Sequence, residues 1–153
     1  MFDTQSIENV IKKQGTFIST TVGLSMFPML RDRRDVIVVK PANRRLKRYD
    51  VPLYRRDDGV YVLHRIIKAE NDSYVIIGDN CINKEYGITD EQILGVLSGF
   101  YRNSKYIDCE KSVLYKIYYH IWCDALPVRV FLIRCVNKLR RIVRGLHKKQ
   151  ISD

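Results

Sequence analysis

The chain has 153 residues, of which 46% are hydrophobic and 29% are charged. This composition excludes a disordered chain, because it supplies enough apolar side chain to bury a core. The length predicts one domain of catalytic size with an appendage. The net charge of +10 is unevenly placed, since residues 111–150 hold ten Lys or Arg and a single acid, Asp124. The basic character therefore belongs to a C-terminal segment and not to the first 110 residues.

The cysteines give no sign of a metal or cofactor site. Cys81, Cys109, Cys123 and Cys135 form no Cys-x-x-Cys pair and have no histidine at ligand spacing beside them, so no zinc site and no cofactor is expected. Reduced thiols and disulfides both stay open, because four cysteines allow three pairings. Residues 1–16 contain no continuous apolar run, so we expect no export signal and a cytoplasmic location.

The first 110 residues predict a short helix followed by strands. Ile7, Val10 and Ile11 fit one face of a helix that stops near Gly15. Short segments rich in β-branched and aromatic residues follow, separated by Asp, Asn, Gly or Pro, and they predict about six strands. These strands are expected at residues 17–22, 36–39, 51–54, 60–67, 74–77 and 93–100. Asp57-Asp58-Gly59 predicts a hairpin turn that leads into the strand carrying His64.

From Ser112 onward the apolar residues follow a helical period, and Pro127 divides the segment into two helices. The expected apolar faces are Leu114, Ile117, Tyr118, Ile121, Trp122 and Ala125 in the first helix, and Val128, Phe131, Leu132, Cys135, Val136, Leu139, Ile142, Val143 and Leu146 in the second. No stretch has the ~20 apolar residues needed to span a bilayer. We therefore predict a mainly β domain over residues 1–110 and a basic amphipathic helical tail over residues 111–153.

Three polar residues of the predicted β domain could act together. Ser25 lies in Gly-Leu-Ser-Met-Phe-Pro-Met-Leu, His64 in Leu-His-Arg-Ile and Asp79 in Gly-Asp-Asn. A hydroxyl, an imidazole and a carboxylate are the minimum set for activating a weak nucleophile. A histidine with an ordinary pKa near ~6.5 is mostly neutral at cytoplasmic pH, so His64 can accept the Ser25 proton. The three residues predict a serine peptidase.

The order of these motifs resembles the signal peptidase I superfamily, which also contains self-cleaving SOS-type repressors. The ordered set is Ser-Met-x-Pro, an Asp-led β run, His-Arg-Ile, Gly-Asp-Asn and a Leu-Gly-Val strand, and it covers roughly residues 15–102. In that family the serine is the nucleophile, and the base is lysine or, in the endoplasmic-reticulum and spore-forming-bacterial branch, histidine. The base position here is His64. The resemblance thus implies a serine endopeptidase of the histidine branch, with the family's β fold.

The resemblance implies two candidates for the acid that orients His64. Asp79 and Glu85 both correspond to acidic positions in the histidine branch, where the later position is usually Asp. Because Glu85 is one methylene longer than that Asp, we favour Asp79 by a small margin.

The resemblance also places the oxyanion and substrate contacts beside the nucleophile. The residues implied are Gly23, Leu24, Met26 and Pro28. Many signal peptidases have Ser or Thr at the position of Gly23 to help bind the oxyanion, so backbone amides near Ser25 are expected to take that role here. Gly23 would then permit close approach of the substrate.

Each of these residues also has an ordinary structural interpretation. Ser25 could cap a local turn, and His64 could be a half-buried strand residue with a satisfied hydrogen bond. Asp79 could form an Asx turn, and Glu85 could be a solvated loop charge. Cys81 is an alternative nucleophile, although nothing around it in the sequence marks an activated thiolate.

Two functional hypotheses follow. The first is a serine endopeptidase that cleaves a leader, signal or propeptide segment, which the family resemblance implies is bound in extended form along a β edge. The second is a non-catalytic peptide-binding or regulatory domain tethered by its tail, which Gly23 and Glu85 favour. Covalent labelling of Ser25 would discriminate between the two.

The tail has its own alternatives. Its basic and aromatic residues, over residues 112–148, fit an anionic membrane surface on the inner face of the cell membrane. Packing on its own domain or on a partner protein is weighed equally. Nucleic acid ranks third because no reader motif is present, and the first 16 residues are too short for a helix-turn-helix.

Overall fold

The computed structural model describes residues 7–125, 127–136 and 138–139. The elements before the final helix are α1 (Ile7–Gln14), β1 (Phe17–Thr20), β2 (Val36–Lys40), β3 (Pro52–Arg55), β4 (Tyr61–Leu63), β5 (Arg65–Ala69), β6 (Tyr74–Ile77), β7 (Glu85–Ile88), a 3₁₀ turn (Asp90–Gln92), β8 (Ile93–Arg102) and β9 (Lys105–Asp108). The helix α2 (Val113–Asp124) follows, and residues 127–136 and 138–139 are also helical. The prediction of a mainly β chain with C-terminal helices is confirmed at this level.

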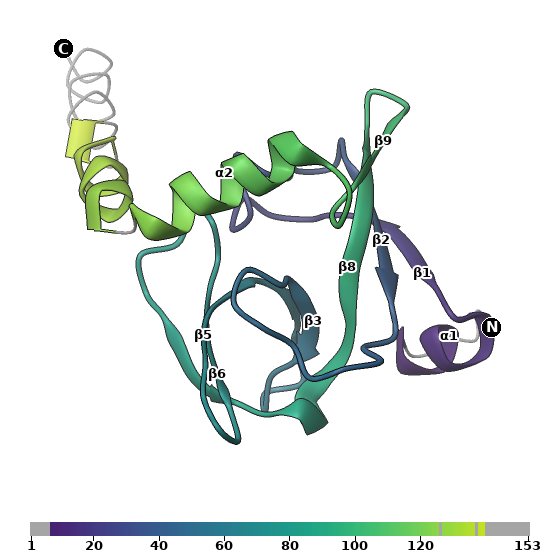
Figure 1. Ribbon diagram of the computed structural model, residues 1–153. Helices are drawn as coiled ribbons and strands as arrows, with labels where there is room; N and C mark the ends of the chain where they lie inside the picture. The colour runs from purple at the N-terminus through teal and green to yellow at the C-terminus, as the bar shows by residue number, and fades with distance from the viewer. Residues whose placement is uncertain (1–6, 126, 137, 140–153) are drawn as a thin grey trace, which may run out of the picture.

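The described strands form two antiparallel sheets. The larger has the order β1-β2-β8-β3-β4, with β9 paired to β8, and the smaller has the order β5-β6-β7. The long strand β8 pairs with β2, β3 and β9 and so holds the larger sheet together. Figure 1 shows both sheets curling, with α2 lying across one end of them and α1 beside β1.

The chain changes sheets at His64. The sequence predicts one strand over residues 60–67, but the structure has two, because Leu63 of β4 pairs with Leu53 while Arg65 of β5 pairs with Ile77 in the other sheet. His64 is the single residue between them. The predicted hairpin before β4 is confirmed, since β3 and β4 pair antiparallel and Gly59 has a φ of +84°. The strands β7 and β9 were not predicted, because each is short and carries charged or glycine residues that mask an alternating pattern.

Two apolar clusters position the segments that carry the candidate site. The first includes Met26, Met29 and Leu30 from the loop around Ser25, packed against strands of the larger sheet. The second includes Tyr54, whose hydroxyl lies 3.4 Å from His64 Nδ1, and Ile66, which is two residues after His64. Because each fully buried large apolar side chain contributes about 1.5–3 kcal/mol, both clusters fix these segments firmly.

The side of α2 that packs on the domain coincides only in part with the apolar face expected from the sequence. Ser112 caps its N-terminus by accepting a hydrogen bond from the Tyr115 N–H, which confirms where it begins. The buried residues are Tyr115 and Cys123, whereas Leu114 is 80% and Ile121 is 64% exposed. Leu114, Ile117 and Ile121 of the expected apolar face are therefore exposed, whereas Tyr118 and Trp122 of the same face donate hydrogen bonds to Asp79. The tyrosine face is buried instead, because its hydroxyl groups reach polar groups inside the domain.

The helical segment after Pro127 also exposes apolar side chains. Val128, Phe131, Leu132, Val136 and Leu139 are all exposed. The predicted face residues Ile142, Val143 and Leu146 lie outside the described residues. Within the part of the chain that the structure describes, no helix is both long enough and apolar enough to cross a membrane.

Candidate active site

Ser25 lies in a compact turn between β1 and β2. The side chain is half-buried, and its neighbours Met26 and Leu30 are joined by a backbone hydrogen bond of 2.8 Å. Gly23 has a φ of +103°, which favours glycine, and its N–H donates to Asp32 Oδ1 at 2.7 Å. These contacts hold the serine at the protein surface on a constrained loop.

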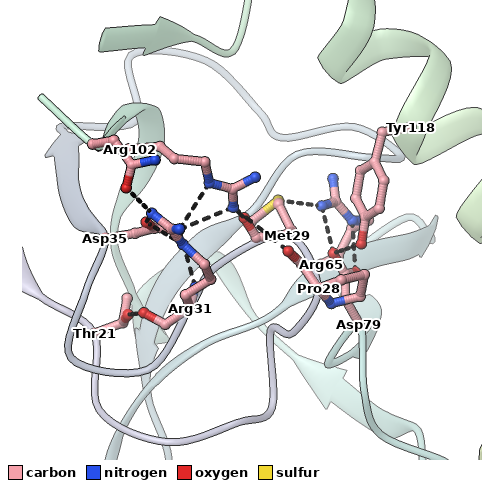
Figure 2. A network of polar contacts seen from close by, with 10 residues as sticks. Thr21, Pro28, Met29, Arg31, Asp35, Arg65, Asp79, Arg102 and Tyr118 are labelled. Carbon is pink, nitrogen blue, oxygen red and sulfur yellow. Dashed lines mark hydrogen bonds and ion pairs between the residues drawn. The ribbon is translucent and has the colours of Figure 1, made fainter. Parts of the chain in front are cut away.

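A buried carboxylate secures the far end of this loop. Asp35 accepts hydrogen bonds from the guanidinium groups of Arg31 and Arg102, at 2.7 Å and 2.9 Å for the shortest of each. Arg102 also donates to the carbonyl oxygen of Met29, as Figure 2 shows. Burial alone would raise the pKa of Asp35, but the hydrogen bonds from Arg31 and Arg102 outweigh it and the pKa lies below its usual value. The carboxylate therefore stays charged and keeps the loop in place.

Gly78 is the point at which the serine and histidine segments meet. A Cβ atom added there would lie 2.7 Å from the Ser25 carbonyl oxygen, 2.9 Å from His64 Nε2 and 2.6 Å from Cys81 Sγ. The Asn80 N–H donates to the same Ser25 carbonyl at 2.7 Å. Only glycine fits at this position. The structure therefore brings the backbone of Ser25 and the ring of His64 to the same glycine.

His64 is held through Nδ1 by Glu85. The Nδ1 atom lies 2.9 Å from Glu85 Oε1 and 3.4 Å from the Tyr54 hydroxyl. Since a carboxylate can only accept, we assign the proton to Nδ1, which leaves Nε2 as the acceptor that faces Gly78. This is the tautomer that a general base for Ser25 requires.

The charge balance around His64 keeps the ring neutral. His64 is buried, and this burial lowers its pKa, although the nearby Glu85 carboxylate opposes the shift. Arg56 holds Glu85 with two hydrogen bonds of 2.7 Å and 2.6 Å. Burial would raise the pKa of Glu85, but the bonds from Arg56 outweigh it and the pKa is lowered. A charged Glu85 can therefore orient a neutral imidazole near pH 7.

Asp79 has a different role from the one that we favoured. Its carboxylate is fully buried and accepts two bonds from Arg65, at 2.9 Å and 2.8 Å, and one from the Tyr118 hydroxyl at 3.0 Å. Figure 2 shows these three side chains together with Met29 of the serine loop. Among the described contacts, none joins Asp79 to the His64 ring. The preference for Asp79 over Glu85 as the orienting acid is thus corrected, because both Asp79 oxygens are already used by Arg65.

The predicted oxyanion and substrate residues divide into two groups. Leu24 is exposed and Pro28 is half-buried, but Met26 is only 4% exposed and belongs to the core, so its side chain is not a substrate contact. The Gly23 N–H is already bonded to Asp32. Within the described residues, the N–H groups of Leu24, Ser25 and Met26 donate no hydrogen bond, and these amides are the candidate oxyanion donors.

Several residues at the site were not foreseen. Val22 and Phe27 flank Ser25 and are exposed large apolar side chains. Tyr54 and Arg56 support His64 and Glu85. The β3 hairpin that carries Tyr54 and Arg56 was predicted, but nothing in the sequence indicated that its residues reach the histidine.

The alternative nucleophile Cys81 lacks activation. Burial raises the pKa of its thiol, with the Glu85 charge acting in the same direction. A thiol that stays protonated at neutral pH is a poor nucleophile.

In the described part of the chain, the Ser25 Oγ also forms no hydrogen bond, and apo active sites often show such unengaged groups until substrate binds.

Comparisons with protein-family models, with curated proteins and with solved structures found no match to this chain.

We predict that Asp79→Asn will mainly destabilise the fold. The change leaves the Arg65 guanidinium buried without its counter-charge, which costs roughly 3–5 kcal/mol. Urea unfolding measures this loss, and Glu85→Gln serves as the control, because Glu85 is partly exposed and should cost much less. An Asp79→Asn protein as stable as wild type would contradict the structural role.

We predict that Glu85→Gln will lower the pKa of His64 further. The Glu85 carboxylate favours the imidazolium form, so its removal favours the neutral ring and also leaves Arg56 unpaired beside it. A proton NMR titration of the histidine resonances gives the answer, with the exposed His120 as internal reference. An unchanged or raised His64 pKa would show that Glu85 does not act on the ring.

Proposed function

We propose that this chain is a serine endopeptidase of the signal-peptidase type, which removes a leader, signal or propeptide segment. The observation that carries the proposal is the convergence on Gly78 of the Ser25 carbonyl and His64 Nε2, with Glu85 on the opposite nitrogen of the ring. The resemblance in motif order supports the same activity, although no comparison tests it.

The proposed reaction is acyl transfer through Ser25. Ser25 Oγ attacks the scissile carbonyl while His64 Nε2 takes its proton, and the charge on the imidazolium is stabilised by Glu85. The Ser25 and Met26 amides stabilise the oxyanion. His64 then gives the proton to the leaving amine, and a water molecule deacylates the serine by the same route. In this mechanism Asp79 is a positioning residue that touches no reacting atom.

The strand edges around the site suit an extended substrate. Ser25 follows β1, His64 follows β4 and Glu85 begins β7, and within the described residues each of these strands pairs on one side only. A peptide can add to such an edge by backbone hydrogen bonds, with side chains filling apolar contacts. The exposed Val22, Leu24 and Phe27 beside Ser25 supply those contacts. The structure therefore favours an apolar segment near the cleavage point.

We also propose that the tail holds the protein to the cytoplasmic face of an anionic membrane. One face of α2 packs on the domain through its tyrosines, while Leu114, Ile117 and Ile121 point outward. The exposed apolar residues after Pro127 extend this surface. Exposed apolar side chains in a segment rich in Lys and Arg are typical of a helix at a membrane interface. Such an anchor would place the peptidase beside membrane-bound substrates.

We predict that Ser25→Ala and His64→Ala will each abolish cleavage of a peptide library read by mass spectrometry. Loss of either member of such a pair lowers kcat by roughly 10⁴-fold or more. Cys81→Ala is the matched control and should remain active. Retained cleavage by Ser25→Ala, or selective loss in Cys81→Ala, would overturn the assignment. If the folded wild-type protein cleaves no peptide, the result would favour the non-catalytic binding domain.

We predict that the double variant Leu114→Glu, Ile121→Glu will lose binding to vesicles containing phosphatidylglycerol. Both side chains are exposed, so folding should be unaffected while the added charges oppose burial in the interface. Co-sedimentation measures the bound fraction, with Val60→Glu as a control at an exposed apolar position on the β domain. Wild-type binding that is equal for neutral and anionic vesicles, or absent from both, would count against the membrane anchor.

A further inference from the structure

Arg129 is a buried cation without a hydrogen-bond acceptor. It lies in the helical segment 127–136 and is 3% exposed. Within the described residues, its Nε, Nη1 and Nη2 atoms are all buried and have no partner. The guanidinium lies 5.8 Å from the centre of the Trp122 ring, a cation–π contact that leaves its N–H groups unsatisfied. A buried guanidinium with no acceptor is energetically costly, so it needs an explanation.

Among the described residues, no nearby group balances this charge. Asp79 is the carboxylate that most favours the charged Arg129, but its oxygens already accept bonds from Arg65 and Tyr118. Burial raises the pKa of Cys123 to about 11, so that thiol stays neutral. Burial lowers the pKa of Arg129, yet an arginine starts so high that it remains protonated. Two guanidinium groups therefore share one carboxylate in a region closed to water.

The unbalanced charge lies behind the loop that holds the catalytic groups. The Trp122 indole N–H donates to the Asp79 carbonyl oxygen at 2.8 Å, which joins the Arg129 environment to the turn 78–81. The next residue, Asn80, donates its N–H to the Ser25 carbonyl. The Arg129 charge also acts on Cys81, the residue that contacts Gly78. The cation is thus adjacent to the candidate site rather than part of a remote surface.

We propose that Arg129 is the binding site for a carboxylate of the substrate, carried by an Asp or Glu side chain close to the scissile bond. The inference rests on the proposed peptidase function and names a feature of its substrate. A carboxylate would accept two parallel bonds from the planar guanidinium and cancel the excess charge. To reach it, the acidic side chain enters between the segment 127–136 and the turn 78–81, which must part to admit it. Arg129 then selects acidic over neutral substrates.

The experiment uses full-length Ser25→Ala protein, which binds peptides without cleaving them. Pairs of extended peptides, identical except for Glu or Gln at one position, are titrated while the fluorescence of Trp122 is recorded. Trp122 is the single tryptophan of the chain and its ring centre lies 5.8 Å from the Arg129 guanidinium, so its fluorescence reports on this site. Arg129→Met tests the charge, Arg129→Lys keeps charge without the planar fork, and Arg134→Met is the control at an exposed arginine of the same segment.

At one position of the peptide, Glu should bind roughly 10- to 100-fold more tightly than Gln, as charge-assisted hydrogen bonds require. Arg129→Met should lose this preference while Arg134→Met keeps it, and Arg129→Lys should keep part of it if the methionine variant does not fold. The inference would be overturned if the Glu and Gln peptides bound with equal affinity or if neither bound. A fluorescence response to inorganic phosphate alone would also overturn it. Because binding is read without turnover, wild-type protein that discriminates but never cleaves would refute only the peptidase function.

Discussion

The buried ion pair between Arg65 and Asp79 is the interaction on which the site depends. Both side chains are fully buried, and the same guanidinium also contacts Tyr115 of α2 and the sulfur of Met29 in the serine loop. Arg65 follows His64 in the chain, and Asp79 follows Gly78, so the pair sets where the base lies relative to the glycine. A buried pair of this kind is weak evidence for net stability, but the loss of one partner is strongly unfavourable. Its physical effect is therefore to exclude other arrangements of these segments.

This pair also gives Asp79 and Glu85 different surroundings. Asp79 is closed to water and saturated by Arg65 and Tyr118, whereas Glu85 lies at a strand edge, partly exposed and shared between Arg56 and His64. The environment and not the residue type decides which acid contacts His64. It also makes α2 a structural part of the β domain, since its hydroxyl groups complete the buried network. The helix α2 is thus more than an appendage.

The sequence was sufficient for the parts of the molecule that local patterns control. The first helix, the β3–β4 hairpin and most strands follow from apolar periodicity and turn residues. Which acid contacts His64 depends instead on the switch of sheets at that residue, a tertiary event with no local signal. Apolar periodicity did not show which side of α2 packs on the domain, because Arg65 and Asp79 require the hydroxyl partners that Tyr115 and Tyr118 supply. The burial of Arg129 was not predicted, because a basic residue in an amphipathic segment carries no local sign of it.

Asp35 and Asp79 are both buried carboxylates beside two arginines, but the arginines differ in their exposure to water. Asp35 is also shared by two guanidinium groups, those of Arg31 and Arg102, but these side chains are 23% and 33% exposed and water screens their excess charge. Around Asp79, Arg65 is fully buried and Arg129 is nearly so. Two guanidinium groups beside one carboxylate are therefore screened by water at Asp35. At Asp79 the same arrangement leaves a positive charge that water does not screen. An excess positive charge that solvent cannot reach, joined through Trp122 to the turn 78–81, is the physical reason for proposing an anionic ligand at Arg129.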